Sequence, residues 1–279
     1  MLTDADVERW LREDVGHHDV TNQVPGETEG RLVAKETGTV AGLDAARAVF
    51  DYLDCEVRSA SKRGGDTAEQ VRSGDTIEPG DVVLTVEGPA RAVLRGERVA
   101  VNVVGHAAGI ATKTAAAVDA VGDHDAAIAG TRKTTPGLRG VEKRAVAAGG
   151  GDTHRLDLSH MVMVKDNHVA EMGLAGAIDH FRERASFATN LDVEVETVED
   201  APRAAELGAD VVLLDNMTPE ETERAVELVA EADGETLTEA SGGITVETVP
   251  AYAATGVDVI SMGSLTHSAP TLDLSFRTG

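Results

Sequence analysis

The chain has 279 residues, enough for one large domain or two smaller ones, and its 42% hydrophobic content is that of a globular protein. Its net charge of −24 repels nucleic-acid backbones, and its seven aromatic residues are too few for a surface that stacks bases. A single cysteine, Cys55, excludes an internal disulfide, and no apolar run is long enough for a membrane span, so we expect a cytoplasmic protein that binds neither nucleic acid nor membrane.

The first hundred residues are predicted to mix helices and strands. The acidic start of the chain lacks the basic region of a signal peptide, so none is expected there. Helices are predicted over 4–13, over 42–53 from the spacing of apolar residues, and over 94–121 from the alanine-rich composition. The predicted strands are 30–34, 38–41, 82–86 and 90–94.

Short apolar strands alternate with helical segments after residue 125. The predicted strands are 126–129, 161–164, 193–195, 211–214, 236–238 and 257–261. Helices such as 198–207 and 219–232 fall between them and stop at Gly208 and Gly234. This alternation indicates parallel strands that are buried on both faces. Polar residues after almost every strand favour an α/β barrel, whose site lies at the carboxyl ends of the strands; a doubly wound sheet is the alternative.

A local inversion of charge marks residues 131–165. Here seven basic residues stand against three acidic ones, a net charge of +4 inside a chain of net charge −24. Lys143 and Arg144 fall on a predicted helix, where we expect them at the surface. Because guanidinium and ammonium groups bind carboxylates and phosphates, we expect the following bases to hold a multiply anionic small molecule: Arg132, Lys133, Arg155 and Lys165.

Acidic residues and glycines follow other predicted strands. Glu196 and Asp215 stand at the ends of adjoining strands, where two carboxylates suit a hard cation such as Mg²⁺; salt bridges to neighbouring bases are the alternative. Glu194 is the second choice for Glu196, because alternation puts both side chains on one face of the strand. The glycine-rich turns at 241–243 and 262–264 can present backbone N–H groups to a phosphate.

The acidic residues are spread through the whole chain, and only six lysines are present. Dispersed acid with scarce lysine is typical of salt-adapted proteins, because high salt screens the repulsion between surface charges. We therefore predict a halophilic protein, with an ordinary acidic protein as the alternative.

Several motifs follow one another in a fixed order along the chain. The most specific reads Ala-Gly-Thr-Arg-Lys-Thr-Thr-Pro-Gly over 129–137. Others lie at 13–21, 95–102, 149–151, 154–155, 164–168, 193–196, 214–216, 239–244 and 262–267. In content and order they resemble the quinolinate phosphoribosyltransferases, or carboxylating nicotinate-nucleotide pyrophosphorylases. The departures from the pattern are the pair His17 and His18, Thr153 and Asp157, none of which is a charge-bearing ligand.

This resemblance implies an α/β fold with an N-terminal α/β sandwich domain followed by an incomplete α/β barrel of about seven strands. It places the sandwich at residues 1–105, joined by the returning chain at about 268–279, and the barrel at 106–267. It also implies a homodimer or an assembly of dimers, in which Arg98 of one subunit completes the site of the other. From the residues alone, Arg98 is a surface helix residue.

The resemblance further implies a pentosyltransferase that converts quinolinate and phosphoribosyl pyrophosphate into nicotinate mononucleotide, pyrophosphate and CO₂ in NAD synthesis, with Mg²⁺. For the dicarboxylate it implies Arg98, Arg132, His154, Arg155 and Lys165. For the donor it implies Lys133 between the two substrates, and Glu196 and Asp215 at the ribose and Mg²⁺. At the 5′-phosphate it implies Ser241, Gly242, Gly243 and Gly263. It also puts Thr134 and His267 in the substrate site. The implied catalytic residues are Lys133, Lys165, Glu196 and Asp215. A related phosphoribosyltransferase that uses nicotinate or another acid, and a non-catalytic anion-binding paralogue, stay open as alternatives.

Overall fold

The structure is a computed structural model that describes residues 2–60 and 70–279. The chain divides into two compact units. Unit 1 contains residues 1–115, 134–150 and 266–279, and unit 2 contains residues 116–133 and 151–265. The predicted boundary between residues 105 and 106 falls inside one continuous helix, α3 (Ala90–Val121). Within the described residues, no helix combines the length and the apolar character that crossing a membrane requires.

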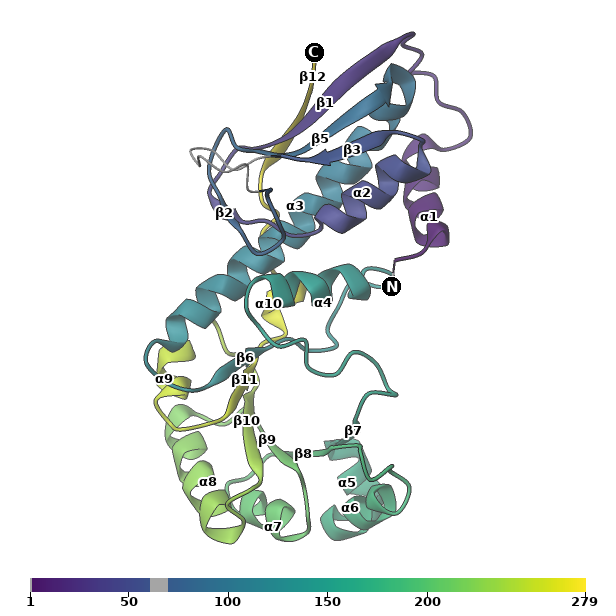
Figure 1. Ribbon diagram of the computed structural model, residues 1–279. Coiled ribbons are helices and arrows are strands. Elements are labelled where there is room, and N and C mark those ends of the chain that lie inside the picture. The colour runs from purple at the N-terminus through teal and green to yellow at the C-terminus, as the bar shows by residue number, and fades with distance from the viewer. Residues whose placement is uncertain (1, 61–69) are drawn as a thin grey trace. The chain divides into compact units, whose positions relative to one another are not determined.

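Unit 1 is built on a four-stranded antiparallel sheet in the order β12-β1-β5-β3. Its strands are β1 (Glu27–Ala34), β3 (Glu56–Ser59), β5 (Val82–Pro89) and β12 (Leu274–Thr278). The last strand of the chain thus pairs with the first, as Figure 1 shows. Two short strands, β2 (Gly38–Thr39) and β4 (Thr76–Ile77), pair separately. The returning C-terminal segment therefore belongs to the fold of unit 1.

The helices of unit 1 contribute buried apolar side chains to its core. They are α1 (Asp4–Val15), α2 (Leu43–Tyr52), the first part of α3, and α4 (Arg139–Ala148). Leu32, Phe50 and Leu84 meet in the core, and the ring of Phe50 stacks on that of Phe276 with centroids 5.8 Å apart. Gly109 lies on α3 against the returning chain, where an added Cβ would stand 1.8 Å from the carbonyl oxygen of Pro270. Only glycine permits so close an approach between helix and chain.

Two expectations about unit 1 are wrong. Residues 90–94, predicted as a strand, are the first five residues of α3. Ala, Arg and Leu are good helix formers, and the helix continues unbroken after them. Lys143 is buried, with 3% of its surface exposed, because α4 is enclosed along most of its length. Its neighbour Arg144 does lie nearer the surface, where it forms an ion pair of 2.9 Å with Asp44.

Unit 2 is built on a six-stranded parallel sheet in the order β6-β11-β10-β9-β8-β7. Its strands are β6 (Ala127–Ala129), β7 (Val162–Val164), β8 (Leu191–Val195), β9 (Val211–Asp215), β10 (Leu237–Ser241) and β11 (Val259–Ser261). Asp152 adds a single parallel bridge beside Ala129, so seven segments line up. No closed barrel forms among the described residues. The incomplete α/β barrel is confirmed, with six strands and one bridging residue for the seven strands expected.

Helices pack on the outer face of this sheet, as Figure 1 shows for α7 and α8. The helices that follow the strands are α5 (Asp166–Met172), α6 (Leu174–Arg182), α7 (Asp200–Glu206), α8 (Pro219–Ala232), α9 (Val249–Ala253) and α10 (Ser264–His267). Val193 and Val195 of β8 belong to the apolar layer beneath them. Because side chains alternate along a strand, Asp192 and Glu194 must face the interior of the barrel. The fold thus directs acidic side chains inward.

Candidate active site

The carboxyl ends of the parallel strands in unit 2 carry most of the predicted site residues. Lys165 follows β7, Glu196 follows β8, and Asp215 is the last residue of β9. Ser241 ends β10, and Gly263 lies two residues after β11. Since parallel strands end at the same edge of their sheet, these residues line one rim, which is where α/β barrels build their sites.

An ion pair between Lys165 and Glu194 marks this rim. The Nζ atom of Lys165 lies 2.7 Å from Oε2 of Glu194, whose side chain is only 11% exposed. Burial raises the pKa of Asp215, and the carboxylate of Glu194 raises it further, whereas Lys165 and Lys133 act in the opposite direction. Glu194 therefore lies close to both Lys165 and Asp215. Glu196 is exposed, one residue past the end of β8.

The glycine-rich turn after β10 rests directly on the end of β9. The backbone N–H of Asn216 donates to the carbonyl oxygen of Ser241 at 2.8 Å, and Asn216 Nδ2 donates to Asp215 Oδ2 at 2.7 Å. Gly242 has a φ of 100°, and a Cβ there would meet Asn216 Oδ1 at 2.3 Å. Glycine is required at this position for both reasons. The turn brings exposed backbone beside Asp215, as a phosphate site needs.

A buried guanidinium is the candidate anion-binding group of unit 2. Arg155 is only 6% exposed, and its Nη2 donates to the sulfur of Met163 at 3.4 Å. Its Nε atom is buried without a hydrogen-bond partner among the described residues. Burial lowers the pKa of Arg155, and the charge of nearby Arg132 lowers it further. Two guanidiniums that repel each other suit an anion that carries more than one carboxylate.

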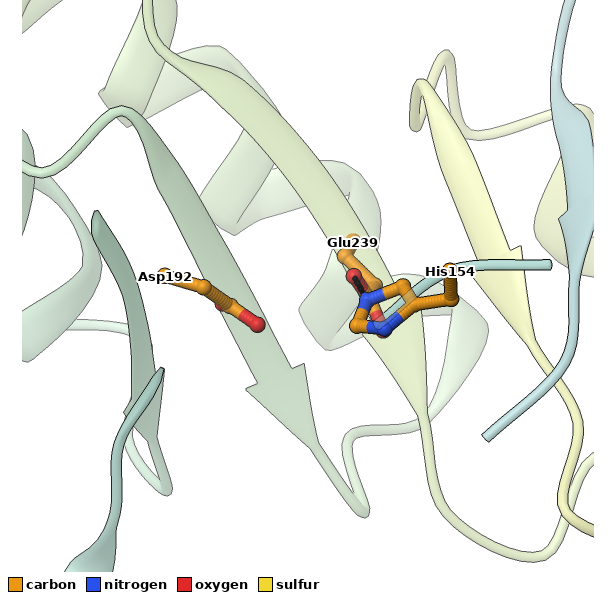
Figure 2. Close-up of side chains that lie close together, drawn as sticks. All are labelled: His154, Asp192 and Glu239. Atoms are coloured by element: carbon orange, nitrogen blue, oxygen red, sulfur yellow. Dashed lines mark hydrogen bonds and ion pairs between the residues drawn. The ribbon is translucent and has the colours of Figure 1, made fainter. Parts of the chain in front are cut away.

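His154 lies in the barrel interior with two acidic residues, as Figure 2 shows. Its Nε2 is 2.9 Å from Oε2 of Glu239, a residue of β10 that is 2% exposed. Asp192 of β8 is fully buried and points toward the other two. Burial raises the pKa of Asp192 to about 8, and Glu239 contributes to the same shift. One ligand atom from each of the three residues lies within 4.8 Å of the others.

Family models match the chain along nearly its whole length. The model described as quinolinate phosphoribosyl transferase, C-terminal domain, matches residues 110–277, and its N-terminal domain counterpart matches residues 19–108. The chain belongs to the quinolinate phosphoribosyl transferase family. The family predicted from the motifs is thereby confirmed.

Similar proteins agree with this membership. A probable nicotinate-nucleotide pyrophosphorylase (carboxylating) from Bacillus subtilis is 42% identical over 270 residues, which cover 95% of this chain and 90% of that protein. The human nicotinate-nucleotide pyrophosphorylase (carboxylating) is 41% identical, covering 97% of this chain and 90% of its own length. The crystal structure of NadC from Streptococcus pyogenes has a TM-score of 0.88 at 40% identity and covers 99% of this chain and 97% of its own.

Three residues that the family resemblance put in the site belong to unit 1. Arg98 on α3 has a side chain that is 60% exposed, with an ion-pair distance of 3.8 Å to Glu97. It lines a cavity of about 420 Å³ together with His18 and Asp19. Thr134 Oγ1 accepts a hydrogen bond from Arg139 at 2.9 Å, and His267 is exposed beside Ser268. Their roles in the family reaction stay predictions.

The sequence reasoning missed two interior acids of this family member. Asp192 was not singled out, and Glu239 was quoted in a motif without a role. Two signals were present. The first is that acidic residues recur at every second position at 192, 194 and 196, which puts acidic groups on one face of a strand. An acid within the run 237–241 is the second such signal, because a charge inside a buried strand needs a partner.

Proposed function

We propose that this protein transfers the phosphoribosyl group of phosphoribosyl pyrophosphate to quinolinate and removes one carboxyl group as CO₂. The product is nicotinate mononucleotide, with pyrophosphate released, as the names of the relatives imply for those proteins. The observation that carries the proposal is the buried guanidinium of Arg155 beside that of Arg132. Quinolinate, with adjacent carboxylates on one ring, supplies the two negative charges that such a pair can accept.

Around this pair the remaining residues take the roles that the family resemblance gave them. The dicarboxylate would be held by Arg132, His154, Arg155 and Lys165, together with Arg98 from the partner subunit. Lys133 would lie between the substrates, and the turn at 241–243 with Gly263 would take the 5′-phosphate. We assign the carboxylate beside the ribose to Glu194 in preference to Glu196, because Glu194 is the acid that pairs with Lys165.

The acids at the carboxyl ends of β8 and β9 fit a divalent cation. Asp215 and Glu196 offer the carboxylate oxygens that Mg²⁺ prefers. The raised pKa of Asp215, due to burial and then to Glu194, supports this assignment because a cation would offset the crowding of negative charge. When bound, Mg²⁺ would neutralise charge on the pyrophosphate leaving group.

The chemistry then needs positioning and charge in place of a nucleophilic side chain. The bond from ribose C1 to pyrophosphate breaks as the pyridine nitrogen bonds to C1, and nearby carboxylates favour the positive charge that develops on the ribose. The ring nitrogen becomes cationic, so the bond from C2 to its carboxyl group can break with the electron pair left on C2. A proton takes the place of the lost carboxyl group. The basic residues hold the dicarboxylate in register for both steps.

The choice of acceptor tests this proposal. The protein is incubated with phosphoribosyl pyrophosphate, Mg²⁺ and either quinolinate or nicotinate, and the nucleotide product is identified by mass. We expect nicotinate mononucleotide from quinolinate only, because nicotinate leaves one guanidinium without a carboxylate partner. Product from nicotinate and none from quinolinate would contradict the proposal and favour a related phosphoribosyltransferase.

We also propose, from the family resemblance, that the protein is a cytoplasmic homodimer. We propose further that it works in a salty environment, since its charge of −24 is dispersed and lysine is scarce. The melting temperature without substrate should then rise steeply from dilute buffer to molar KCl at fixed pH. The Debye length falls from about 30 Å to about 3 Å over that range, which removes the self-repulsion of the folded chain. A gain of about 3 kcal/mol would raise the melting temperature by roughly 6–12 °C.

The same salt should weaken the attraction of the basic site for anions, so the KM for quinolinate should rise as the protein becomes more stable. A melting temperature that stays flat over this range would refute the halophilic part of the proposal. It would leave the enzymatic part untouched, because the two depend on different residues.

A further inference from the structure

Glu239 makes a direct contact with a residue proposed to bind substrate. Its carboxylate is 2.9 Å from Nε2 of His154, and 2% of the residue is exposed to solvent. A buried carboxylate requires a partner, and a hydrogen bond to a carboxylate stabilises the protonated imidazole. The contact therefore fixes both the direction of the ring and the nitrogen that carries a proton.

The backbone of His154 is fixed as well. Its φ of 51° lies in the left-handed region, which is unusual for a residue other than glycine. Its N–H donates to Oδ1 of Asp152 at 2.5 Å. Strained backbone of this kind persists where surrounding contacts over-determine it, and it clusters at functional sites. His154 is thus held from two sides, at its backbone by Asp152 and at its ring by Glu239.

Asp192 completes the surroundings of the pair. It is fully buried, and neither of its carboxylate oxygens has a hydrogen-bond partner among the described residues. Two ionised carboxylates so close in a dry interior would repel, and the raised pKa of Asp192 keeps this one neutral near pH 7. The negative charge of the cluster then stays on Glu239, opposite His154.

Other charged and titratable groups lie around the cluster of His154, Asp192 and Glu239. Arg155 is the next residue, Glu194 follows Asp192 on β8, and Arg132 lies close to Arg155. His160 lines the same cavity of about 340 Å³ as His154 and Glu239. The spacing of His154, Asp192 and Glu239 would also suit a metal ion. A metal ion would take the lone pair of the histidine nitrogen that it binds and leave that nitrogen unprotonated, so metal binding and a doubly protonated ring are alternatives that experiment separates.

We propose that Glu239 is a positioning residue that holds His154 in place and in its protonated form, so that His154 adds a positive charge to the dicarboxylate site. This inference rests on the proposed function, in which quinolinate binds beside Arg132 and Arg155. Glu239 acts through His154 and need not touch the substrate.

A matched pair of variants tests the proposal. Glu239→Gln and Asp192→Asn each replace one buried carboxyl group of the same cluster by an amide of similar shape. Quinolinate binding to the intact oligomer is measured by calorimetry at about pH 6 and about pH 7.5, on either side of the ordinary histidine pKa of about 6.5. We expect the unaltered protein and Asp192→Asn to bind with similar affinity at both values.

Glu239→Gln should bind quinolinate at least tenfold more weakly at the higher pH and recover most of the loss at the lower pH, where imidazole protonates without help. Affinity for phosphoribosyl pyrophosphate should not change. Equal losses in both variants, or a Glu239→Gln loss that is the same at both pH values, would reduce Glu239 to a structural role. If the unaltered protein binds no quinolinate, the proposed function fails instead.

A measurement on the unaltered protein covers the case in which Glu239→Gln does not fold. Nitrogen-15 NMR of labelled histidine, assigned with a His154→Asn variant, should show both ring nitrogens of His154 protonated at about pH 7.5, a full unit above the ordinary value of about 6.5. A neutral ring would overturn the proposal. Tight binding of Zn²⁺ or Mn²⁺ that disappears in Asp192→Asn would also overturn it, because the cluster would then be a metal site.

Discussion

Replacing Arg155 by alanine should nearly abolish turnover of quinolinate while the fold is kept. The guanidinium is 6% exposed and has a buried Nε without a partner, so its main electrostatic partner is expected to be the substrate. Loss of one charged partner from a desolvated site costs about 2–5 kcal/mol, which is roughly a 30-fold to several-thousand-fold loss in kcat/KM. The variant's kcat/KM and its melting temperature are both measured.

Arg203→Ala is the matched control for this experiment. Arg203, like Arg155, belongs to unit 2, but its side chain is 63% exposed and forms an ion pair of 2.6 Å with Asp200. Exposed ion pairs contribute about 1 kcal/mol or less, so kcat/KM should be close to that of the unaltered protein. Near-normal quinolinate kinetics in Arg155→Ala, with the fold intact, would remove Arg155 from the site.

Activity should reappear when two inactive variants, Arg98→Ala and Lys165→Ala, are refolded together. If Arg98 completes the partner subunit's site, each homodimer lacks one residue in both sites and should be inactive. A mixed dimer would have one site with both residues and one with neither, and therefore about half the activity of an unaltered dimer. Random mixing in equal amounts would recover about a quarter of the full activity.

Mixing Arg155→Ala with Lys165→Ala is the control for complementation. Both residues are in unit 2, so every site of the mixed dimer would lack one of them and no activity should return. Recovery with Arg98→Ala but not with Arg155→Ala would identify a shared site. Failure of both mixtures, with subunit exchange demonstrated, would place Arg98 in its own subunit's site or outside any site.

Local signals in the sequence predicted some elements to the residue and others not at all. The helix predicted over 219–232 is observed at those bounds, and its start is fixed by the capping box of Thr218 and Glu221 and by Pro219 in the first turn. The segment 90–94 was predicted as a strand separate from the helix after it, whereas α3 begins at Ala90 and runs through both. The strand predicted over 236–238 starts one residue and ends three residues before the observed β10, which continues through acidic Glu239 to Ser241.

For some candidate site residues, the local signal in the sequence is a position at the end of a predicted strand. Lys165 and Asp215 have this position, because each stands where a buried apolar strand ends. The choice between Glu194 and Glu196 depends on where β8 ends, which the two-residue period does not fix. The pairing of His154 with Glu239 joins residues 85 positions apart, and no local pattern encodes it. Such long-range contacts follow from the order of strands in the sheet.

Release of CO₂ from quinolinate labelled in its 2-carboxyl group tests the central claim most directly. The protein is given phosphoribosyl pyrophosphate, Mg²⁺ and labelled quinolinate, and labelled CO₂ and pyrophosphate are measured together. The proposed reaction predicts equal amounts of both, with none when phosphoribosyl pyrophosphate is left out. Pyrophosphate without labelled CO₂, or quinolinate bound but neither product formed, would contradict it.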